Sequence, residues 1–389
     1  MTYFQNRLQE VSDYFAHGDT HLGYRRLLDA AIETLNFGVY GHTLRFCDWY
    51  DAQAQTGDRS ALQSQVQDLL TVIAAGYNGK AEKPDAVKLK ADNISMRYSH
   101  GSFSLSSTNL EVAASQIVGL VGENGNGKTT LLRVLHGELK PDTGAVNYYL
   151  TNGTKPPDNY ETRSALAFIP QRPLSWYGGL MDNLQFAANF IGYTGAENRL
   201  WTEMMVARMG LRPFRGYNWS RISSGYKMRF ELARTLIRKP QVLLLDEPLA
   251  NLDILAQQII LEDLRFLAQS HTLPLSIILS SQQLYEVEKV SDKVIFLQKG
   301  IPQYQSIKQT EDSPKGLTIE LETAVSRDDL QKLFASHGLQ KLSYNGGVYI
   351  LYFEAATGVS TVLRLLGEAA LPVKYFRDIS ASSRRFFDA

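Results

Sequence analysis

The chain has 389 residues, a length that suits two or three domains with substantial buried cores. Its 40 basic and 40 acidic residues leave no net charge, so the composition favours neither nucleic acid nor an anionic membrane surface as a partner. The single cysteine, Cys47, excludes an internal disulfide and fits a reducing compartment. No run approaches the ~18–20 apolar residues that span a bilayer, and the first residues lack the form of a signal peptide, so we expect a soluble protein.

Residues 1–76 show the spacing of helices and no strand pattern. Apolar side chains recur at helical intervals over residues 24–35 and 62–73, and glycines at Gly18, from Gly38 to Gly41, and at Gly57 are expected to separate the helices. We predict a helical accessory bundle of up to four helices, followed by a glycine-rich, charged linker at residues 77–85.

Two groups of side chains in this bundle have alternative interpretations. Tyr24-Arg25-Arg26 and the aromatic cluster of Phe46, Trp49 and Tyr50 either form a docking face or pack in the bundle's own core and rim. The second interpretation is the more economical, because aromatic residues at helical spacing usually face a core.

A phosphate-binding loop follows. Residues 122–130 read Gly-Glu-Asn-Gly-Asn-Gly-Lys-Thr-Thr and fit the pattern G-x-x-x-x-G-K-[ST], between an apolar strand-like run and a helix. Glycines let backbone N–H groups surround phosphate oxygens, Lys128 can reach the β- and γ-phosphates, and the Thr129 hydroxyl can bind Mg²⁺. The residues expected to bind nucleotide here are Gly122, Glu123, Asn124, Gly125, Asn126, Gly127, Lys128, Thr129 and Thr130.

Two adjacent carboxylates end a second buried strand at residues 242–245. Asp246 suits Mg²⁺, directly or through water, and Glu247 suits the polarisation of an attacking water. A solvated acidic turn would look the same in isolation, but the phosphate-binding loop upstream favours the catalytic interpretation. Between the two motifs, residues 180–220 are expected to form a helical insert in which Trp201 packs, with Trp176 packing just before it.

Residues 316–389 alternate between strand and helix patterns. Strands are expected at 317–321, 341–344, 348–353 and 371–376, and helices at 327–337 and 359–366. Asn345-Gly346 is the dipeptide that type I′ hairpins favour. The order βαββαβ predicts a small α+β ferredoxin-like domain.

About residues 86–300 resemble the ATP-binding-cassette (ABC) ATPases, on the strength of the loop at 122–130 and the pair Asp246-Glu247. The resemblance implies an α/β fold, a P-loop NTPase of ABC type with a helical insert. It also implies that Tyr98 stacks on adenine, although a core position for this tyrosine stays open. Gln171, in the segment 168–173, matches a loop glutamine that contacts Mg²⁺ and lies near the membrane subunit in that family.

The segment 222–229 stands at the position of the family's signature sequence. Ser223 and Gly225 match it, while Ser224 and Tyr226 depart from it. The resemblance implies that Ser223, Ser224 and Gly225, together with Asp253 of the following loop, contact the nucleotide of an opposing subunit. A second ABC ATPase subunit is therefore expected, either identical or similar.

Gln282 stands where the family carries a histidine near the γ-phosphate. A glutamine amide can hydrogen-bond a phosphate, but it cannot become a cation or move a proton near neutral pH. We expect Gln282 to take the catalytic position with Lys128 and Glu247, and we expect hydrolysis to be slowed but retained.

The resemblance favours one function, an ATPase subunit that uses ATP and Mg²⁺ and dimerises to drive polytopic membrane subunits on separate chains. It implies a cytoplasmic location at the inner face of the membrane, with residues 316–389 as a regulatory appendage similar to those of some bacterial exporters, and no nucleic-acid partner. Two alternatives remain: a nucleotide-gated regulator with attenuated hydrolysis, which Gln282 and the altered signature keep open, and a soluble ABC protein acting on the ribosome or DNA. The single cassette, without heptad repeats between its motifs, argues against the last.

Overall fold

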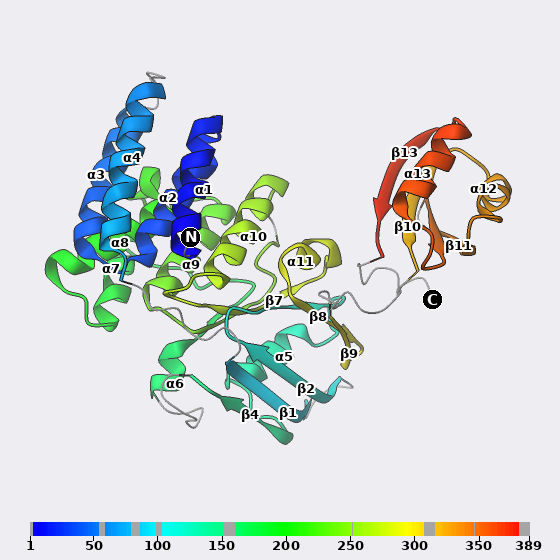
Figure 1. The fold of residues 1–389 in the computed structure, drawn as a ribbon. Helices are drawn as coiled ribbons and strands as arrows, with labels where there is room; N and C mark the ends of the chain where they lie inside the picture. Colours follow the sequence, from blue (N-terminus) through cyan, green and yellow to red (C-terminus); the bar gives the residue numbers. More distant parts are fainter. Residues whose placement is uncertain are drawn as a thin grey trace. The chain divides into compact units, whose positions relative to one another are not determined.

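The computed structural model describes residues 3–53, 59–78, 86–98, 103–150, 160–250, 252–306, 316–345 and 347–380. The chain divides into two units, one of residues Met1–Ser291 and Ile295–Gln303 and the other of Asp292–Val294 and Tyr304–Ala389 (Figure 1). The mixed α/β architecture agrees with the predicted fold class. The expected linker at 77–85 lies mostly outside the described residues.

The first unit begins with a bundle of helices. These are α1 (Tyr3–His17), α2 (Thr20–Glu33), α3 (Phe37–Gln53) and α4 (Arg59–Gly76). The break between α2 and α3 lies at Leu35 and Asn36, and not at the glycines from Gly38 to Gly41 that the sequence suggested. Leu35 has a left-handed φ of 47°, and the side chain of Asn36 accepts a hydrogen bond from the Gly38 N–H at 2.8 Å, so the glycines belong to α3.

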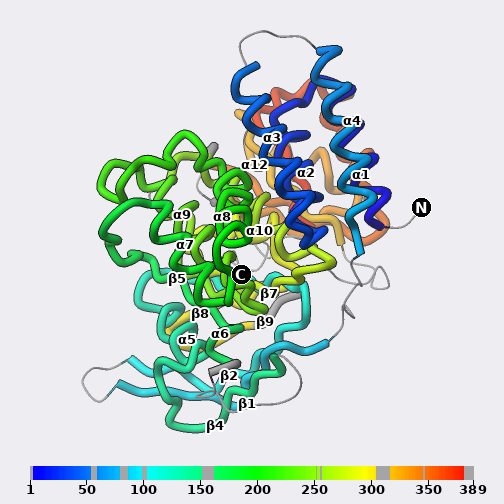
Figure 2. The backbone as a smooth tube through the Cα atoms, turned by 90° about the vertical axis from the view of Figure 1, so that its left-hand side faces the viewer, coloured from blue at the N-terminus to red at the C-terminus, as the bar shows by residue number. Residues whose placement is uncertain are grey.

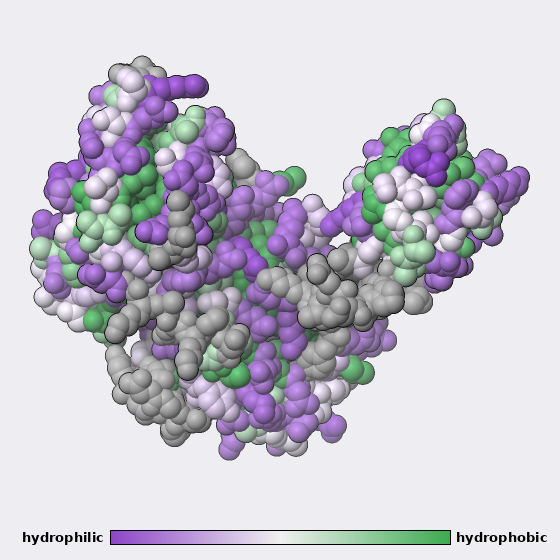
Figure 3. Space-filling model, in the orientation of Figure 1, coloured by the Kyte–Doolittle hydropathy of each residue, from purple (hydrophilic) through white to green (hydrophobic). Residues whose placement is uncertain are grey.

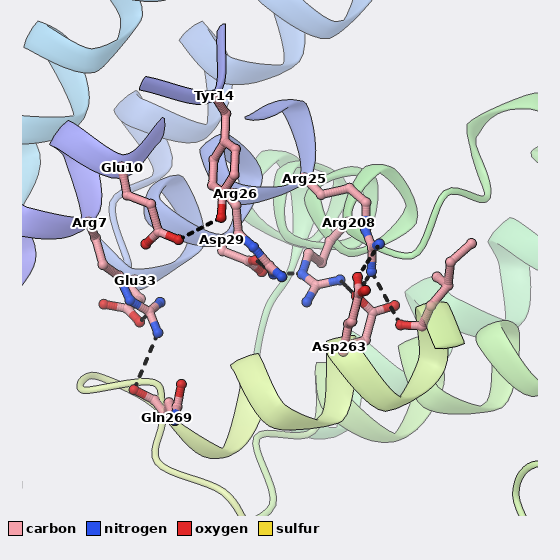
Figure 4. A network of polar contacts seen from close by, with 12 residues as sticks. Arg7, Glu10, Tyr14, Arg25, Arg26, Asp29, Glu33, Arg208, Asp263 and Gln269 are labelled. Atoms are coloured by element: carbon pink, nitrogen blue, oxygen red, sulfur yellow. Dashed lines mark hydrogen bonds and ion pairs between the residues drawn. The ribbon is translucent and has the colours of Figure 1, made fainter. Parts of the chain in front are cut away.

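Buried charges join the bundle to the ATPase segment. Arg208 of α8 (Gly195–Arg208) binds Asp29 of α2 and, at 2.7 Å, Asp263 of α10 (Ile254–Ala268), and Arg25 of α2 also binds Asp263 (Figure 4). The side chains of Arg208 and Asp263 are only 1% and 4% exposed. Burial opposes the charge on Asp263, but Arg208 and Arg25 outweigh it and hold the pKa of the carboxyl below its usual range.

Further contacts extend this junction at both ends. The guanidinium of Arg212 lies 2.5 Å from Asp48 and 2.8 Å from Asp51, both on α3. At the other end, the Tyr3 ring stacks on His271 at 3.4 Å. Figures 1 and 2 both show the bundle against α8 and α10.

These contacts decide between the two interpretations of the predicted docking face. Arg25 and Arg26 are turned toward α10, where Arg26 lies over the ring of Phe266. Tyr24 stacks on Tyr50 at 4.6 Å within the bundle itself. The arginines therefore contact the chain's own ATPase segment, and the aromatics pack in the bundle. Whether residues 1–76 fold without that segment stays a prediction.

Two sheets form the ATPase segment. The six-stranded sheet has the order β5-β6-β7-β3-β8-β9 and the three-stranded sheet the order β2-β1-β4. The six strands are β3 (Ile117–Val121), β5 (Leu166–Ile169), β6 (Val242–Leu245), β7 (Ser276–Ser281), β8 (Lys293–Gln298) and β9 (Ile301–Ser306). The three strands are β1 (Val87–Arg97), β2 (Ser104–Ala113) and β4 (Thr143–Tyr148).

Helices cover both faces of the larger sheet, which explains its continuous apolar strands. Every residue of β3, β6 and β7 is buried, as expected for a central strand of a parallel sheet. Helix α5 (Lys128–Leu135) lies between the two sheets, while α10 and α11 (Leu284–Val290) cover the opposite face (Figure 1). Gly119 allows α11 to approach, because a Cβ there would lie 1.9 Å from Val287.

The predicted helical insert is confirmed. It consists of α7 (Leu180–Phe190), α8 and two short 3₁₀ turns, Arg212–Phe214 and Trp219–Arg221, and it leads into α9 (Ser224–Ile237). A short helix, α6 (Tyr160–Ala165), precedes β5. Trp201 is fully buried, and its indole N–H donates to the carbonyl of Ile237 at 3.0 Å.

The second unit contains a four-stranded antiparallel sheet with the order β11-β12-β10-β13. Its elements are β10 (Thr318–Thr323), α12 (Arg327–Phe334), β11 (Leu339–Asn345), β12 (Val348–Phe353), α13 (Val359–Glu368) and β13 (Val373–Asp378). The chain order βαββαβ with the first strand between the third and the fourth is the ferredoxin-like topology. Gly346 of the expected turn lies outside the described residues.

A groove lies on the surface of the bundle. It runs between α1 and α4, measures about 460 Å³ and is lined by Leu8, Leu70 and Ala74 together with uncharged polar residues. Figure 3 shows hydrophobic side chains on this side of the bundle, within an otherwise largely hydrophilic face. Among the described residues, no helix is long and apolar enough to cross a membrane.

The buried charges at the junction make a prediction about stability. Arg208→Ala should lower the free energy of unfolding by about 3–5 kcal/mol, because it removes the cation that Asp29 and Asp263 share in a buried place. Urea denaturation followed by tryptophan fluorescence measures the change. In the control Lys90→Ala, an exposed pair with Asp92 at 3.0 Å is lost, which should cost less than about 1 kcal/mol. Equal losses in the two variants would contradict the role of the buried network.

Candidate functional site

Three neighbouring parallel strands bring the predicted motifs to one edge of the larger sheet. β3 pairs with β7 and β7 pairs with β6, all in parallel. Their carboxyl ends therefore lie side by side, and the chain that leaves each end carries a motif: the loop 122–130 after β3, Asp246-Glu247 after β6, and Ser280 to Gln282 at the end of β7. Crevices at this edge are where open α/β sheets bind ligands.

The glycines of the loop are required by geometry. Gly125 and Gly127 have positive φ angles of 81° and 98°, which residues with a Cβ rarely adopt. At Gly127 a Cβ would lie 2.4 Å from the ring of Phe103, and at Gly122 it would lie 2.4 Å from the carbonyl oxygen of Leu297. The loop thus curls closely against its surroundings, and helix α5 begins at Lys128 directly after it.

Lys128 lies across this loop. Its ammonium donates to the carbonyl oxygens of Gly122 at 2.6 Å and Glu123 at 3.2 Å, and it lies 3.0 Å from a carboxylate oxygen of Glu247. The lysine and the glutamate are both buried, with side chains 5% and 10% exposed. A cation held between the loop carbonyls and the proposed catalytic carboxylate is placed to meet an anion in the loop.

A serine connects the two acidic residues. The Thr129 hydroxyl donates to one oxygen of Asp246 at 2.8 Å, and the Ser280 hydroxyl donates to the other at 2.8 Å. The same Ser280 oxygen accepts the backbone N–H of Glu247 at 2.9 Å. Glu247 itself has a positive φ of 49°, an uncommon conformation that is concentrated at functional sites.

The oxygen atoms at this point fit Mg²⁺. Thr129 and Asp246 offer a hydroxyl and a carboxylate that already lie 2.8 Å apart, and Gln171 offers an amide oxygen in the wall of the same cavity. Magnesium in nucleotide sites takes one or two protein oxygens and completes its shell with phosphate and water. The described residues hold no group of three or more His, Cys, Asp or Glu side chains that could bind a metal without such help.

A cavity of about 320 Å³ opens at the loop. Its walls include Glu123, Asn124, Gly125, Gly127, Lys128, Thr129, Thr130, Gln171 and Glu247, together with the aromatic rings of Tyr98 and Phe103. The Tyr98 hydroxyl lies 3.2 Å from that of Thr130, and the tyrosine is exposed at the rim. Tyr98 is therefore placed to stack on a base, which stays a prediction.

Two predicted residues of the loop lie outside that wall. Gly122 is packed against Leu297, and the side chain of Asn126 accepts the backbone N–H of Lys299 at 3.0 Å. Both residues hold the loop against the end of β8. We therefore expect them to contact a nucleotide through their backbone groups and not through side chains.

The signature segment and the following loop lie beside each other. Ser223 is the N-cap residue of α9, but its hydroxyl makes no capping hydrogen bond. Ser224 and Gly225 are the first two residues of the helix. A Cβ at Gly225 would lie 3.8 Å from Leu252 and from Ala256, next to Asp253. Asp253 accepts the Ala256 N–H at 2.8 Å and caps α10. The structure places these residues at two helix N-termini, and their action on a second subunit stays a prediction.

Tyr226 and Gln282 are the two departures from the family pattern. The Tyr226 ring packs on that of Phe214, with ring centres 4.0 Å apart, so this side chain joins α9 to the helical insert. Gln282 is exposed at the end of β7 and is not part of the cavity wall. Close by, burial raises the pKa of Glu286 and the charge of Glu247 acts in the same direction, although a hydrogen bond from Ser281 opposes them.

Sequence reasoning missed Ser280 and Phe103. Ser280 had one signal, its place at the carboxyl end of a parallel strand beside the other motifs. Phe103 had none, because its contact with the loop depends on how the chain returns toward β2.

The segment that carries these residues is similar to known proteins. A family model described as ABC transporter matches residues 105–250. The chain is 30% identical over 191 residues to the ABC transporter ATP-binding protein NatA of Bacillus subtilis, a match that covers 49% of this chain and 76% of that protein.

Solved structures share the fold. One is cbiO1 from Clostridium perfringens, part of the ABC transporter complex cbiONQ, with a TM-score of 0.51, 24% identity, and coverage of 57% of this chain and 89% of that one. Another is a dimeric structure of the ATP-binding cassette MJ0796 bound to ADP and Pi, with a TM-score of 0.50, 21% identity, and coverage of 57% and 100%.

Proposed function

The chain belongs to the family of ABC transporter ATP-binding proteins, and we propose that it hydrolyses ATP to drive membrane subunits carried on other chains. The single observation that carries the proposal is the cluster of Lys128, Thr129, Asp246 and Glu247 at one sheet edge, joined by contacts of 2.8–3.0 Å. A phosphate group in the loop would meet the cation and the helix N-terminus together. A structural ion pair alone would not require the neighbouring glycines with positive φ or the open cavity.

Each residue then has a role in the proposed reaction. Lys128 would exchange its loop carbonyls for the β- and γ-phosphate oxygens. Thr129 and Asp246 would hold Mg²⁺, which would supply positive charge at those oxygens. Glu247, released from Lys128, accepts the proton of the attacking water. Ser280 fixes the orientation of Asp246 and of the Glu247 backbone through its two hydrogen bonds.

Dimerisation is part of the proposal. Ser223 and the first residues of α9 are not among the residues that line the chain's own cavity, and the Ser223 hydroxyl is not used to cap the helix. A helix N-terminus with a free hydroxyl suits the γ-phosphate of a nucleotide bound to a second subunit. The dimer of the similar cassette MJ0796 supports this idea.

An apolar surface beside Gln171 is the proposed docking site for a membrane subunit. Leu174 and Tyr177 are 75% and 92% exposed, and on α7 Phe186 and Phe190 are 65% and 61% exposed. These two parts of the surface adjoin. The side chain of Asn183 on α7 donates to the Tyr177 carbonyl at 2.8 Å, and Asn183 lies on the same face of the helix as Phe186, three residues further on. Large exposed apolar groups gathered in this way are typical of an interface.

Two substitutions test the chemistry. Lys128→Ala should abolish binding of labelled Mg-ATP, because the cation at the phosphates is lost. Glu247→Gln should keep ATP affinity and reduce hydrolysis by about 10³-fold or more, since the amide keeps the shape without the base. Equilibrium binding and phosphate release separate the two effects. A Glu247→Gln protein that hydrolyses ATP at the parent rate would remove the proposed catalytic role.

Gln282 makes a second prediction. A neutral amide adds no positive charge as the phosphate becomes more anionic, so the parent protein should be slow and Gln282→His should raise kcat by about tenfold with unchanged ATP affinity. Steady-state phosphate release is the measurement. The neighbouring exposed residue provides the control Gln283→His, which should change nothing. A Gln282→His rate equal to that of the parent would show that the site is adapted to glutamine.

The proposed docking surface leads to a further prediction. Tyr177→Asp should prevent copurification with a polytopic membrane protein while leaving basal ATP hydrolysis intact, because a charge replaces the most exposed apolar group of the surface. The control is Ile301→Asp, which places the same charge at an exposed apolar side chain on β9, 54% exposed, away from this surface. If both variants copurify equally well with the membrane protein, the interface lies elsewhere.

A further inference from the structure

We propose that Trp176, Glu231 and Arg234, here named the Trp176 cluster, are positioning residues that fix the loop of Gln171 onto helix α9. The proposal rests on the proposed ATPase function for its kinetic consequence, but its structural part does not. Gln171 and Trp176 share the loop between β5 and α7, and Glu231 and Arg234 lie on α9.

Three contacts define the Trp176 cluster. The indole N–H of Trp176 donates to a carboxylate oxygen of Glu231. The guanidinium of Arg234 lies over the Trp176 ring, 4.2 Å from its centre. The same guanidinium donates to the second carboxylate oxygen of Glu231 at 2.9 Å and 3.2 Å. The ring is thus held at its edge by an anion and at its face by a cation, which fixes both its position and its tilt.

Glu231 is the most buried member of the Trp176 cluster, so the loss of its hydrogen-bond donors should cost the most free energy. The carboxylate is 3% exposed and accepts from both partners, so removal of either partner leaves part of a buried charge without a donor. The rest of the loop offers little comparable anchoring, since Leu174 and Tyr177 are 75% and 92% exposed. Beyond Trp176, the loop is held to α7 through Asn183 and to the insert through a bridge between Gly179 and Asn218.

Helix α9 connects the Trp176 cluster to the signature residues. The helix begins at Ser224, so the residues that hold Trp176 belong to the same rigid element as the signature residues Ser223 to Gly225. Gln171, at the other end of the same loop segment, lines the nucleotide cavity. The Trp176 cluster therefore fixes the distance between the cavity glutamine and the signature helix. Loosening it should misplace the Gln171 amide beside the proposed Mg²⁺ position while the loop 122–130 and Lys128 keep their places.

Two conservative variants remove separate contacts. Trp176→Phe keeps a ring for Arg234 and loses the indole donor, while Glu231→Gln keeps an acceptor oxygen for the indole and loses the charge that Arg234 binds. Ser175→Ala is the matched control, an exposed neighbour of Trp176 in the same loop. Thermal unfolding first establishes that each protein is folded.

Hydrogen exchange tests the structural part in the full-length protein without nucleotide. The amides of Leu180 and Asn183, which donate backbone hydrogen bonds where the loop enters α7, should exchange about tenfold faster in Trp176→Phe and in Glu231→Gln than in the parent, and at the parent rate in Ser175→Ala. The double variant should exchange no faster than the faster of the two single variants, because both act on one cluster. Unchanged exchange in both single variants overturns the proposal whether or not the protein hydrolyses ATP.

Kinetics test the consequence. Trp176→Phe and Glu231→Gln should lower kcat for ATP about tenfold with Mg-ATP affinity within about twofold of the parent, a split that general loss of structure would not give. Equal losses of kcat and affinity, or unchanged kcat with faster exchange, would overturn the positioning role. If the parent protein binds ATP but shows no hydrolysis at all, the proposed function fails instead, and the exchange result still stands on its own.

Discussion

The parallel pairing of β6, β7 and β3 is the constraint on which the nucleotide site depends. Because the three strands end at the same edge, Thr129, Asp246 and Ser280 meet there although they lie far apart in the chain. Their hydrogen bonds of 2.8 Å then set both carboxylate oxygens of Asp246. These strands are buried on both faces, so a slip in register would force every side chain to pack against new neighbours and would separate the three polar groups.

A different physical principle joins the bundle to the ATPase segment. Arg208, Asp29 and Asp263 alternate in sign and are buried, so the junction selects a partner by charge as well as by shape. Buried ion pairs contribute little net stability compared with apolar packing, but the loss of one member is expensive. The junction is therefore better suited to fixing one orientation of the bundle than to strengthening the fold. Its contacts reach α8 in the insert and α10 in the core, which ties these two parts together.

The sequence predicted which side chains meet at one edge of the larger sheet, because they belong to short, local patterns. Residue type and spacing alone identify the loop glycines, Lys128 and the pair Asp246-Glu247. The antiparallel topology of the second unit followed in the same way from alternating strands and amphipathic helices. Contacts between distant segments had no such signal: Arg25 and Arg26 looked like surface charges until α10 was placed beside them, and the break at Asn36 was hidden by the glycines that follow it.

The helical insert and α9 are thus held at two places by contacts of unequal strength. At the junction with the bundle, the side chain of Arg208 is 1% exposed, whereas in the Trp176 cluster the side chain of Arg234 is 25% exposed and the loop around Trp176 is largely in solvent. Breaking the first leaves two buried carboxylates without their shared cation, whereas in the second only Glu231 is buried and the guanidinium of Arg234 can be solvated. The proposed docking surface at Leu174 and Tyr177 therefore adjoins the less buried of the two attachments, and the bundle lies at the more buried one.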